Sequence, residues 1–271
     1  MKKVNLMDYL DEVTAFSLEH EEPAWMTELR TTALKNADES ELPHIDRVKF
    51  HRWPLLNVHM ESYVPSEGNV ASFDQMKDNP LIVQQGSFHA FEQLPASLAE
   101  QGVIFTDIFT ALQEHPELVK EYYMTKAVLP EEDKLTAAHA AFMNSGGFLY
   151  VPKKVVIEEP IESLFIQDSD SNQPFFKHVL IVADNHSEFS YLERFQSTGH
   201  HAEKASGNIV VEVIAKDGAK VKYSAVDQLG QTVTTYMNRR GYIMRDASVD
   251  WALGVMNDGD VVADFDSDLV G

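Results

Sequence analysis

Cysteine and long apolar runs are both missing from this sequence. None of the 271 residues is a cysteine, so the chain cannot form a disulfide, a thiolate metal site or a cysteine nucleophile of its own. No stretch approaches the roughly 18 consecutive apolar residues of a membrane helix. At the N-terminus, Asp8, Asp11 and Glu12 interrupt the segment in which a signal peptide would carry its apolar core. These absences predict a soluble cytoplasmic protein.

Basic residues are scarce. The chain holds 22 Lys and Arg against 43 Asp and Glu, and 22 − 43 gives a net charge of −21. A field of that sign repels the phosphates of nucleic acids and the surface of anionic membranes, so we expect neither as a partner. The hydrophobic fraction of 44% nevertheless indicates folded cores. The length allows two domains of ordinary size.

The start of the chain has the pattern of two helices. Leu6, Leu10, Val13 and Phe16 recur at helical spacing between charged residues, which predicts an amphipathic helix. A second helix is predicted over residues 21–35, because acidic residues and a proline stand at its start and basic residues stand nearer its end.

Later helices follow a short strand pair. Residues 81–91 predict a strand, a turn and a second strand. Helical periodicity then covers residues 103–127, where Pro116 begins a new helix instead of continuing the old one. Residues 133–144 form the last predicted helix, which Gly146-Gly147 ends.

Beyond residue 147 the pattern is that of strands, and it repeats. Three segments share one order: an apolar run, a short turn that contains Asp, and an alternating segment that ends on a large aromatic residue. They span residues 178–191, 208–223 and 240–251. Aligning their last residues, Tyr191, Tyr223 and Trp251, gives steps of 32 and 28 residues. Steps of this size are typical of stacked repeats.

The repeats favour one fold class. No segment after residue 147 has the ten or so helical residues that a crossover helix needs, so a doubly wound α/β sheet is not expected. An antiparallel sandwich stays open, but the spacing favours a mainly β fold, a parallel β-helix. We predict an N-terminal helical domain with a short strand pair over residues 1–145, and a parallel β-helix over residues 146–271. The chain stops within another repeat, so we expect the C-terminal end of the β-helix to be missing.

Four histidines form the densest group of metal-ligating side chains: His178, His186, His200 and His201. Adjacent residues of a strand point to opposite faces, so His200 and His201 can chelate one ion only within a turn. Because residues 196–207 are polar by composition, a solvated loop is favoured over a metal site.

Three acids alternate near the end of the chain. Asp264, Asp266 and Asp268 would lie on one face of a strand. Paired acids on a β-helix can hold calcium or act as general acid and base on a polysaccharide. A solvated outer face, with Phe265 and Leu269 buried beneath it, is favoured because no Lys or Arg stands beside the acids.

The other short motifs do not indicate a catalytic or binding site. Ser145-Gly146-Gly147 is too short for a phosphate loop and is interpreted as a hinge between helix and strand. The basic pairs Lys153-Lys154 and Arg239-Arg240 have two interpretations: a docking patch for an anion or partner, or charges at strand edges that discourage aggregation, the more usual role. The sequence therefore assigns no catalytic, cofactor-binding or metal-binding residue.

Several motifs follow one another in a specific order. They are Glu-Pro-Ala-Trp at 22–25, Ala-Leu-Gln-Glu-His-Pro-Glu-Leu-Val-Lys-Glu-Tyr at 111–122, Ser-Gly-Gly-Phe-Leu-Tyr-Val-Pro at 145–152, Glu-Glu-Pro-Ile at 158–161 and Arg-Asp-Ala-Ser-Val-Asp-Trp at 245–251. Over nearly the whole chain they resemble the SufB/SufD family of iron-sulfur cluster assembly proteins. SufB members typically carry a cysteine after the strand that corresponds to residues 191–198, and this chain has none. The N-terminal helical region with Glu-Pro-Ala-Trp at 22–25 resembles the SufD branch most closely, and the missing cysteine supports the same choice. The thiolate role does not carry over.

The resemblance implies a fold and a function. The fold is a right-handed parallel β-helix between an N-terminal and a C-terminal helical domain. The function is that of a non-catalytic scaffold subunit in a SufBCD complex, which assembles an iron-sulfur cluster. In such a complex a SufB-like paralogue pairs through the β-helix and a SufC-like ABC ATPase docks on the C-terminal helices. No cofactor bound by this chain itself is implied.

Two other functions stay open: a β-helix carbohydrate-active enzyme that uses residues 264–268, and a stand-alone interaction module. The missing signal peptide disfavours the enzyme, because polysaccharide enzymes of this shape are normally secreted. We predict that the chain has no ATPase, lyase or hydrolase activity. We also expect self-association through the exposed edges of its coils.

Overall fold

The computed structural model describes residues 5–44, 46, 49, 52–58, 60, 79–168, 173–198 and 204–271. The helices, in chain order, are η1 (Leu6–Tyr9), α1 (Leu10–Glu19), α2 (Ala24–Glu39), α3 (Ala96–Ala99), α4 (Ile108–Glu114), α5 (Pro116–Tyr122) and α6 (Lys134–Phe142). The strands are β1 (Leu81–Gln85), β2 (Phe88–Gln93), β3 (Ile104–Asp107), β4 (Ser145–Val151), β5 (Ile161–Asp168), β6 (Phe175–Ala183), β7 (Glu188–Thr198), β8 (Ala205–Ala215), β9 (Lys220–Gln228), β10 (Val233–Ile243), β11 (Ser248–Val255) and β12 (Val261–Leu269).

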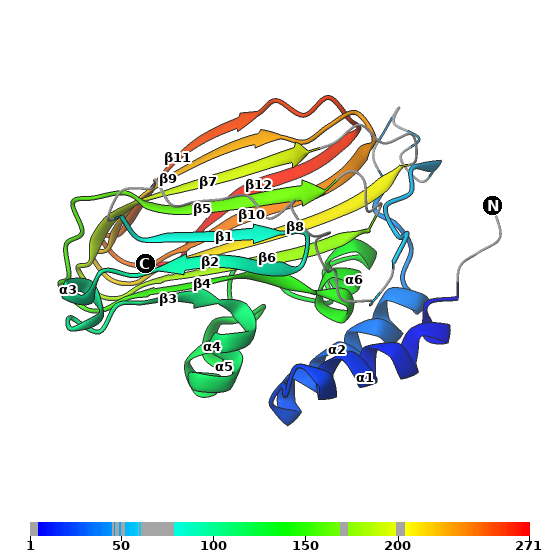
Figure 1. Ribbon diagram of the computed structural model, residues 1–271, viewed down its shortest axis with the longest axis horizontal. Helices are drawn as coiled ribbons and strands as arrows, with labels where there is room; N and C mark the ends of the chain where they lie inside the picture. Colours follow the sequence, from blue (N-terminus) through cyan, green and yellow to red (C-terminus); the bar gives the residue numbers. More distant parts are fainter. Residues whose placement is uncertain are drawn as a thin grey trace.

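Two six-stranded sheets face each other (Figure 1). Sheet A has the strand order β11-β9-β7-β5-β1-β2, and sheet B has the order β12-β10-β8-β6-β4-β3. From β4 onward the chain alternates between the sheets, and each strand pairs in parallel with the strand two places later. We number the coils by these strands: β4–β5 is coil 1, β6–β7 coil 2, β8–β9 coil 3 and β10–β11 coil 4. The predicted parallel β-solenoid is confirmed, with about four turns.

The two sheets continue into the N-terminal part of the chain. β1 pairs in parallel with β5 and antiparallel with β2, so the predicted strand pair over residues 81–91 is confirmed. β3 pairs antiparallel with β4. The two sheets therefore include strands from both sides of residue 145, and the division of the chain into domains there stays a prediction.

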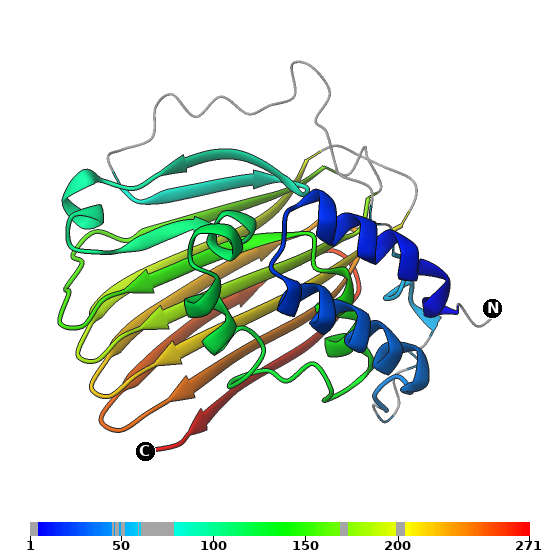
Figure 2. The ribbon, with the colours of Figure 1, turned by 90° about the horizontal axis from the view of Figure 1, so that it is seen from below.

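Helices cover the outer face of sheet B (Figure 2). One hydrophobic cluster joins α1, α2, α4, α5 and α6 to outward-facing residues of β6 and β8, such as Leu180 and Val210. α6 begins with a capping box, in which the Asp133 side chain accepts the N–H of Thr136 and the Thr136 hydroxyl accepts the N–H of Asp133. The predicted helices near residues 6–16, 21–35 and 133–144 are thus confirmed.

Two local predictions were wrong. Residues 104–107 form β3, because the helix starts only where the Asp107 side chain caps it by accepting the N–H groups of Phe109 and Thr110. The predicted break at Pro116 is confirmed, since α5 begins there. Residues 155–157 belong to the region after residue 147 that was predicted to form strands, but they form only an isolated bridge between Val156 and Glu188.

The difference between apolar and alternating segments reflects which sheet they join. In β6 and β8 of sheet B every residue is buried, because helices cover one face and the solenoid interior covers the other. In β7 and β9 of sheet A buried and more exposed residues alternate, because among the described residues only the inner face is covered by other elements. A second hydrophobic cluster, made of the inward residues of both sheets, fills the solenoid.

The tight turns that lead from sheet B to sheet A stack on one another. Each holds one residue with positive φ at the same place, namely Lys154 at 65°, His186 at 60°, Gly218 at 69° and Asp246 at 56°. Their spacing of 32, 32 and 28 residues extends the period seen in the sequence. The backbone N–H of Gly218 donates to the carbonyl of Arg245 in the next turn at 2.8 Å, and that of His186 donates to Asp217 at 2.9 Å.

An aromatic stack marks the same period on sheet A. Tyr191, Tyr223 and Trp251 are direct neighbours in the β7, β9 and β11 ladder. The ring centres of the two tyrosines lie 5.5 Å apart, and those of Tyr223 and Trp251 lie 4.8 Å apart. The sequence alignment of these three residues is therefore a spatial alignment.

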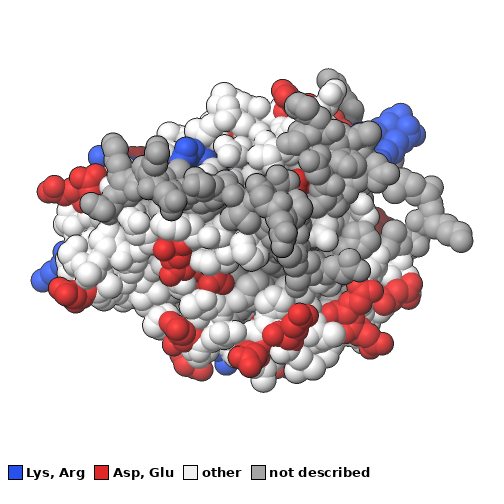
Figure 3. Space-filling model, in the orientation of Figure 1, with Lys and Arg blue, Asp and Glu red and all other residues white. Residues whose placement is uncertain are grey.

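Acidic side chains are spread over the face shown in Figure 3, including the region of α1 and α2. Asp11, Glu12 and Glu19 are exposed on α1. Among the described residues, no helix is both long and apolar enough to cross a membrane.

Candidate functional site

Three buried charged side chains meet inside the solenoid. Arg239 reaches from β10 of sheet B across the interior to Glu193 on β7 and Asp227 on β9 of sheet A. Its guanidinium donates to both oxygens of Asp227, at 2.8 and 2.7 Å, and twice to Oε1 of Glu193, at 3.2 and 2.8 Å. All three residues are fully buried. We call Arg239, Glu193 and Asp227 the interior ion cluster.

The interior ion cluster holds two carboxyl groups and one guanidinium. Burial raises the pKa of Glu193, although the charge of Arg239 acts in the opposite direction. The Oε2 atom of Glu193 is buried and has no hydrogen-bond partner of good geometry among the described residues. Two buried carboxyl groups therefore depend on one guanidinium, and removing it would leave them without a cation.

A lysine lies nearby in the same interior. Lys177 on β6 of sheet B donates from Nζ to Oε1 of Gln84 at 2.8 Å and to the carbonyl of Gly86 at 3.0 Å. Nζ also lies 4.8 Å from the centre of the Phe165 ring. Burial lowers the pKa of Lys177 well below its ordinary value. These hydrogen bonds tie sheet B to the end of β1 in sheet A.

A chain of polar side chains is buried on the outer face of sheet B, beneath α6. Asn208 Oδ1 lies 2.9 Å from His139 Nδ1, and His139 Nε2 lies 3.0 Å from His178 Nδ1. His178 Nε2 faces Oε1 of Glu212 at 3.3 Å. The four side chains are buried, and we call them the histidine cluster.

Burial determines the protonation states of the groups in the histidine cluster. It raises the pKa of Glu212 to about 8 and lowers that of His178 to about 3, and it also lowers the pKa of His139. At neutral pH the carboxyl group is therefore protonated and both imidazoles are neutral. Asn208 donates from Nδ2 to the carbonyl of Leu135, so its Oδ1 accepts from Nδ1 of His139. Nε2 of the neutral His139 then accepts from Nδ1 of His178. Nε2 of His178 faces the Glu212 carboxyl group at 3.3 Å without a hydrogen bond of good geometry among the described residues.

Glu212 also joins the sheet to the segment after α5. Its two oxygens accept the backbone N–H groups of Met124 at 2.7 Å and Val128 at 3.0 Å. His139 comes from α6, and His178 and Glu212 come from β6 and β8. The cluster therefore fixes helices to the solenoid, and its members are held by one another.

A groove crosses the outer face of sheet A. It has a volume of about 420 Å³ and is lined by residues that include Val156, Glu158, Lys220, Lys222 and Asp250. A neighbouring hollow of about 340 Å³ shares its Val156, Ile157 and Glu158 lining. Side chains of both charges surround Val156, which is 58% exposed.

Two of the four histidines singled out in the sequence lie in the described part of the chain, on different elements. His200 and His201 lie outside the described residues. His178 is buried in the histidine cluster, and His186 occupies the turn after β6. Ser145-Gly146-Gly147, interpreted as a hinge, forms the first three residues of β4, and residues 143–144 connect α6 to that strand. A Cβ on Gly146 would lie 1.8 Å from the carbonyl oxygen of His178, so this close strand contact requires glycine.

The acids near the end of the chain lie on one face of β12, as predicted. Two details of that prediction were wrong. Phe265 and Leu269 are 39% and 79% exposed, because no described strand packs beyond β12. A basic residue does stand beside the acids, since Arg240 Nη2 lies 3.1 Å from Oδ2 of Asp264. That pairing occupies the Asp264 carboxylate and leaves no observation in favour of a carbohydrate-cleaving pair.

The strand-edge interpretation of Arg239-Arg240 was also wrong. The two side chains point to opposite faces of β10, so Arg239 enters the interior ion cluster while Arg240 pairs with Glu132 at 2.8 Å on the helical side. Lys153 and Lys154 are exposed in the turn after β4. Sequence reasoning missed Glu193 and Asp227, whose only signal is a charge at an inward position of an alternating strand.

The described residues contain one set of three side chains close enough to share a metal ion: His89, Glu92 and Asp107. It was not predicted, because His89 and Glu92 lie on β2 and Asp107 lies at the end of β3, and the three residues form no motif in the sequence. The absence of a metal site therefore stays a prediction of the sequence alone.

The fold and its buried clusters define a class of protein: a parallel β-solenoid with helices packed on one sheet, whose described interior charges are held by partners within the fold. Two family models match consecutive parts of the chain. The SufBD protein N-terminal region matches residues 3–162, and the SufBD core domain of SUF system FeS cluster assembly matches residues 165–271. The chain belongs to the SufBD family, which confirms the resemblance seen in the sequence.

Curated relatives agree with this assignment. The chain is 42% identical over 268 residues to the iron-sulfur cluster assembly protein SufD of Bacillus subtilis, covering 95% of this chain and 61% of the relative. It is 28% identical over 261 residues to an iron-sulfur cluster assembly SufBD family protein of Staphylococcus epidermidis, covering 89% of this chain and 55% of the relative. A family member from Staphylococcus aureus is 27% identical over 252 residues. The chain thus spans less than two thirds of the length of these relatives.

Proposed function

We propose that the chain forms the N-terminal and central part of a SufD-like scaffold subunit, which takes part in iron-sulfur cluster assembly without catalysing a reaction itself. The observation that carries the proposal is the match to both SufBD family models, over residues 3–162 and 165–271. The 42% identity to a SufD over 95% of the chain supports the SufD branch in particular.

The structure gives physical support for a scaffold. The interior charges are engaged with one another, which leaves them occupied with holding the solenoid together. The partners we propose are a SufB-like paralogue, paired through the solenoid, and a SufC-like ABC ATPase, in the cytoplasm. The outer edges of β11 and β12 pair with no described strand. Backbone groups on such edges are free to pair with another chain, so self-association through them is part of the proposal.

A chimera tests the proposal. The matched part of Bacillus subtilis SufD would be replaced by this chain, in a strain that lacks its own SufD. We expect the chimera to co-purify with SufB and SufC of that organism and to restore the activity of an iron-sulfur enzyme. The purified chain alone should hydrolyse ATP no faster than buffer does.

Matched variants separate folding from function in this test. Arg194→Met changes an ion pair on the outer face of sheet A and should leave the chimera active. Arg239→Met breaks the interior ion cluster and should abolish it through loss of the fold. A chimera that is folded by circular dichroism, but neither binds SufB and SufC nor restores the enzyme, contradicts the proposal.

A further inference from the structure

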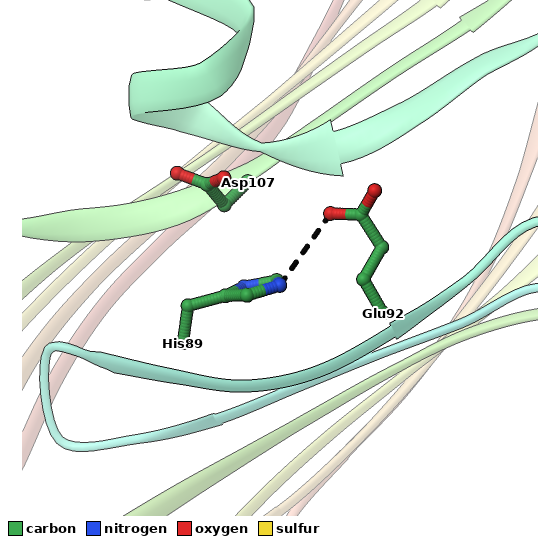
Figure 4. A group of neighbouring side chains, drawn as sticks. All are labelled: His89, Glu92 and Asp107. Carbon is green, nitrogen blue, oxygen red and sulfur yellow. Dashed lines mark ion pairs between the residues drawn. The ribbon is translucent and has the colours of Figure 1, made fainter.

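The two sheets end close together at β2 and β3, and three potential metal ligands meet there. His89 and Glu92 come from β2, the last strand of sheet A, and Asp107 is the last residue of β3, the last strand of sheet B. One ligand atom from each lies within 4.8 Å of the others. Figure 4 shows His89 and Glu92 rising from β2 toward Asp107, which stands beside the start of α4.

A β-bulge places two of these side chains on one face. Residues three apart in a regular strand point to opposite faces. In β2, however, Phe91 pairs with Val83 and His89 pairs with Gln84, so Ala90 is an extra residue without a partner in β1. The bulge shifts the alternation by one residue and turns His89 and Glu92 to the same side.

The two carboxylates are held in place before any ion binds. The Asp107 side chain caps α4, with Oδ1 accepting the N–H groups of Phe109 at 2.9 Å and Thr110 at 3.2 Å. Oε2 of Glu92 accepts the hydroxyl of Thr106 at 2.8 Å, which draws β2 toward β3. Oδ2 of Asp107 also accepts the hydroxyl of Thr110. Oδ2 of Asp107 and Oε1 of Glu92 each keep a lone pair for a further ligand.

The carboxylates of Glu92 and Asp107 lack a lysine or arginine partner, and the imidazole of His89 lacks one hydrogen bond, among the described residues. No Lys or Arg in the described part of the chain forms an ion pair with Glu92 or Asp107, and Nε2 of His89 lies 3.5 Å from Oε2 of Glu92. The other ring nitrogen of His89, Nδ1, is buried and has no described hydrogen-bond partner. A divalent cation would neutralise the two carboxylates and engage the imidazole.

We propose that His89, Glu92 and Asp107 bind a divalent first-row transition metal ion, which joins the end of sheet A to the end of sheet B. One imidazole nitrogen and two carboxylate oxygens form a donor set that suits Zn²⁺ or Fe²⁺, whereas Ca²⁺ and Mg²⁺ prefer oxygen alone. Ligand atoms about 2.1 Å from one ion lie about 3.0–3.5 Å from each other. His89 and Glu92 are each 34% exposed, so small rotations of these two side chains close the gap. Water fills the remaining positions of the ion.

Titration calorimetry with Zn²⁺ on the untagged, chelator-treated 271-residue chain tests the proposal. We expect one saturable site, and a Co²⁺ absorption spectrum that shows nitrogen and oxygen ligands. His89→Gln and Glu92→Gln should each weaken Zn²⁺ binding at least about tenfold. Zn²⁺ should also raise the melting temperature of the wild type more than that of either variant, because it binds only the folded state.

Two controls make the result specific. His44→Gln removes an exposed imidazole that lies 3.1 Å from Asp46 with no third ligand in the described part of the chain, so the variant should bind Zn²⁺ as the wild type does. Replacing both His200 and His201 by Gln should have no effect either. Asp107→Asn keeps the helix cap, because Asn caps helices as well as Asp does, and it should weaken binding while circular dichroism stays unchanged.

Three outcomes overturn the proposal. The first is the absence of saturable Zn²⁺ binding. The second is equal binding by His89→Gln and His44→Gln, or binding that disappears with His200 and His201 instead. The third is displacement of Zn²⁺ by an equal concentration of Ca²⁺, which would show attraction to acidic groups without a role for the imidazole.

Discussion

Sheets A and B have the same strand number and the same parallel ladders, but they meet different surroundings. Sheet B lies between the solenoid interior and a layer of helices, and its strands β6 and β8 are buried along their whole length. Sheet A faces the interior on one side only, and its strands β7 and β9 alternate. A substitution in sheet B or in the interior should therefore cost far more stability than the same substitution on the outer face of sheet A.

The largest effect on stability is expected at the interior ion cluster, where buried ion pairs join the two sheets. Arg239→Met leaves Glu193 and Asp227 buried without their cation, which should lower the free energy of unfolding by about 3–5 kcal/mol. Urea denaturation followed by circular dichroism measures it. The matched change Arg194→Met removes a half-exposed pair with Glu162 on the outer side of sheet A and should cost at most about 1 kcal/mol. Equal losses of unfolding free energy in the two variants would contradict the expected difference between the solenoid interior and the outer face of sheet A.

Next in size is a pair of leucines on the outer faces of the two sheets. Leu180→Ala on β6 opens a cavity beneath the helices and should cost about 2–5 kcal/mol. Leu192→Ala on β7 removes a side chain from the solvent side of sheet A, and the loss should stay under about 1 kcal/mol. Urea denaturation of the two variants measures both losses of unfolding free energy. A larger loss for Leu192→Ala would show that another part of the chain covers sheet A.

The histidine cluster on sheet B should make the stability of the protein depend on pH. The pKa of Glu212 is raised to about 8 by burial, so the folded protein holds a proton that the unfolded chain releases at lower pH. Stability from this group is full below the unfolded pKa and is lost as pH rises toward 8. Glu212→Gln should therefore cost about 1–2 kcal/mol at pH 5, from a disrupted hydrogen bond, and less at pH 8. Urea denaturation at both pH values tests this, and a cost that grows with pH would contradict the protonated carboxyl group.

The smallest effect is expected in the turns that lead from one sheet to the other. Lys154 has a φ of 65°, a conformation that costs a non-glycine residue about 1–2 kcal/mol. Lys154→Gly relieves that strain but adds freedom to the unfolded chain, so a net gain of up to about 1 kcal/mol is expected. Differential scanning calorimetry should show a slightly raised melting temperature. The matched change Lys153→Gly has no positive φ to relieve and should lower it.

The solenoid was predictable from sequence because its signals are local and repeated. The apolar run, the Asp-containing turn and the alternating run correspond to a sheet B strand, a turn and a sheet A strand, and they recur every 28 or 32 residues. Tyr191, Tyr223 and Trp251 aligned correctly because parallel in-register strands keep equivalent residues together. The strand at residues 104–107 was missed because its four residues are too few to show a period of their own.

The interior ion cluster and the proposed metal ligands could not be predicted, for different reasons. A Glu at an inward position of a strand has the same appearance in sequence as one on the surface, and its partner Arg239 lies 46 residues away. Adjacent Arg239 and Arg240 seemed equivalent, although a strand sends them to opposite faces. His89 and Glu92 share a face only because Ala90 forms a bulge, which depends on pairing with β1.

The hydrogen bonds of Arg239 have a consequence for how the solenoid unfolds. In a stack of repeats each unit contacts only its neighbours, so the ends can fray one unit at a time. Arg239 belongs to coil 4, whereas Glu193 belongs to coil 2 and Asp227 to coil 3. One side chain therefore links units that are not adjacent, and opening coil 4 exposes carboxyl groups of the two coils before it. Coils 2 to 4 should lose their structure together, as one cooperative unit of hydrogen exchange.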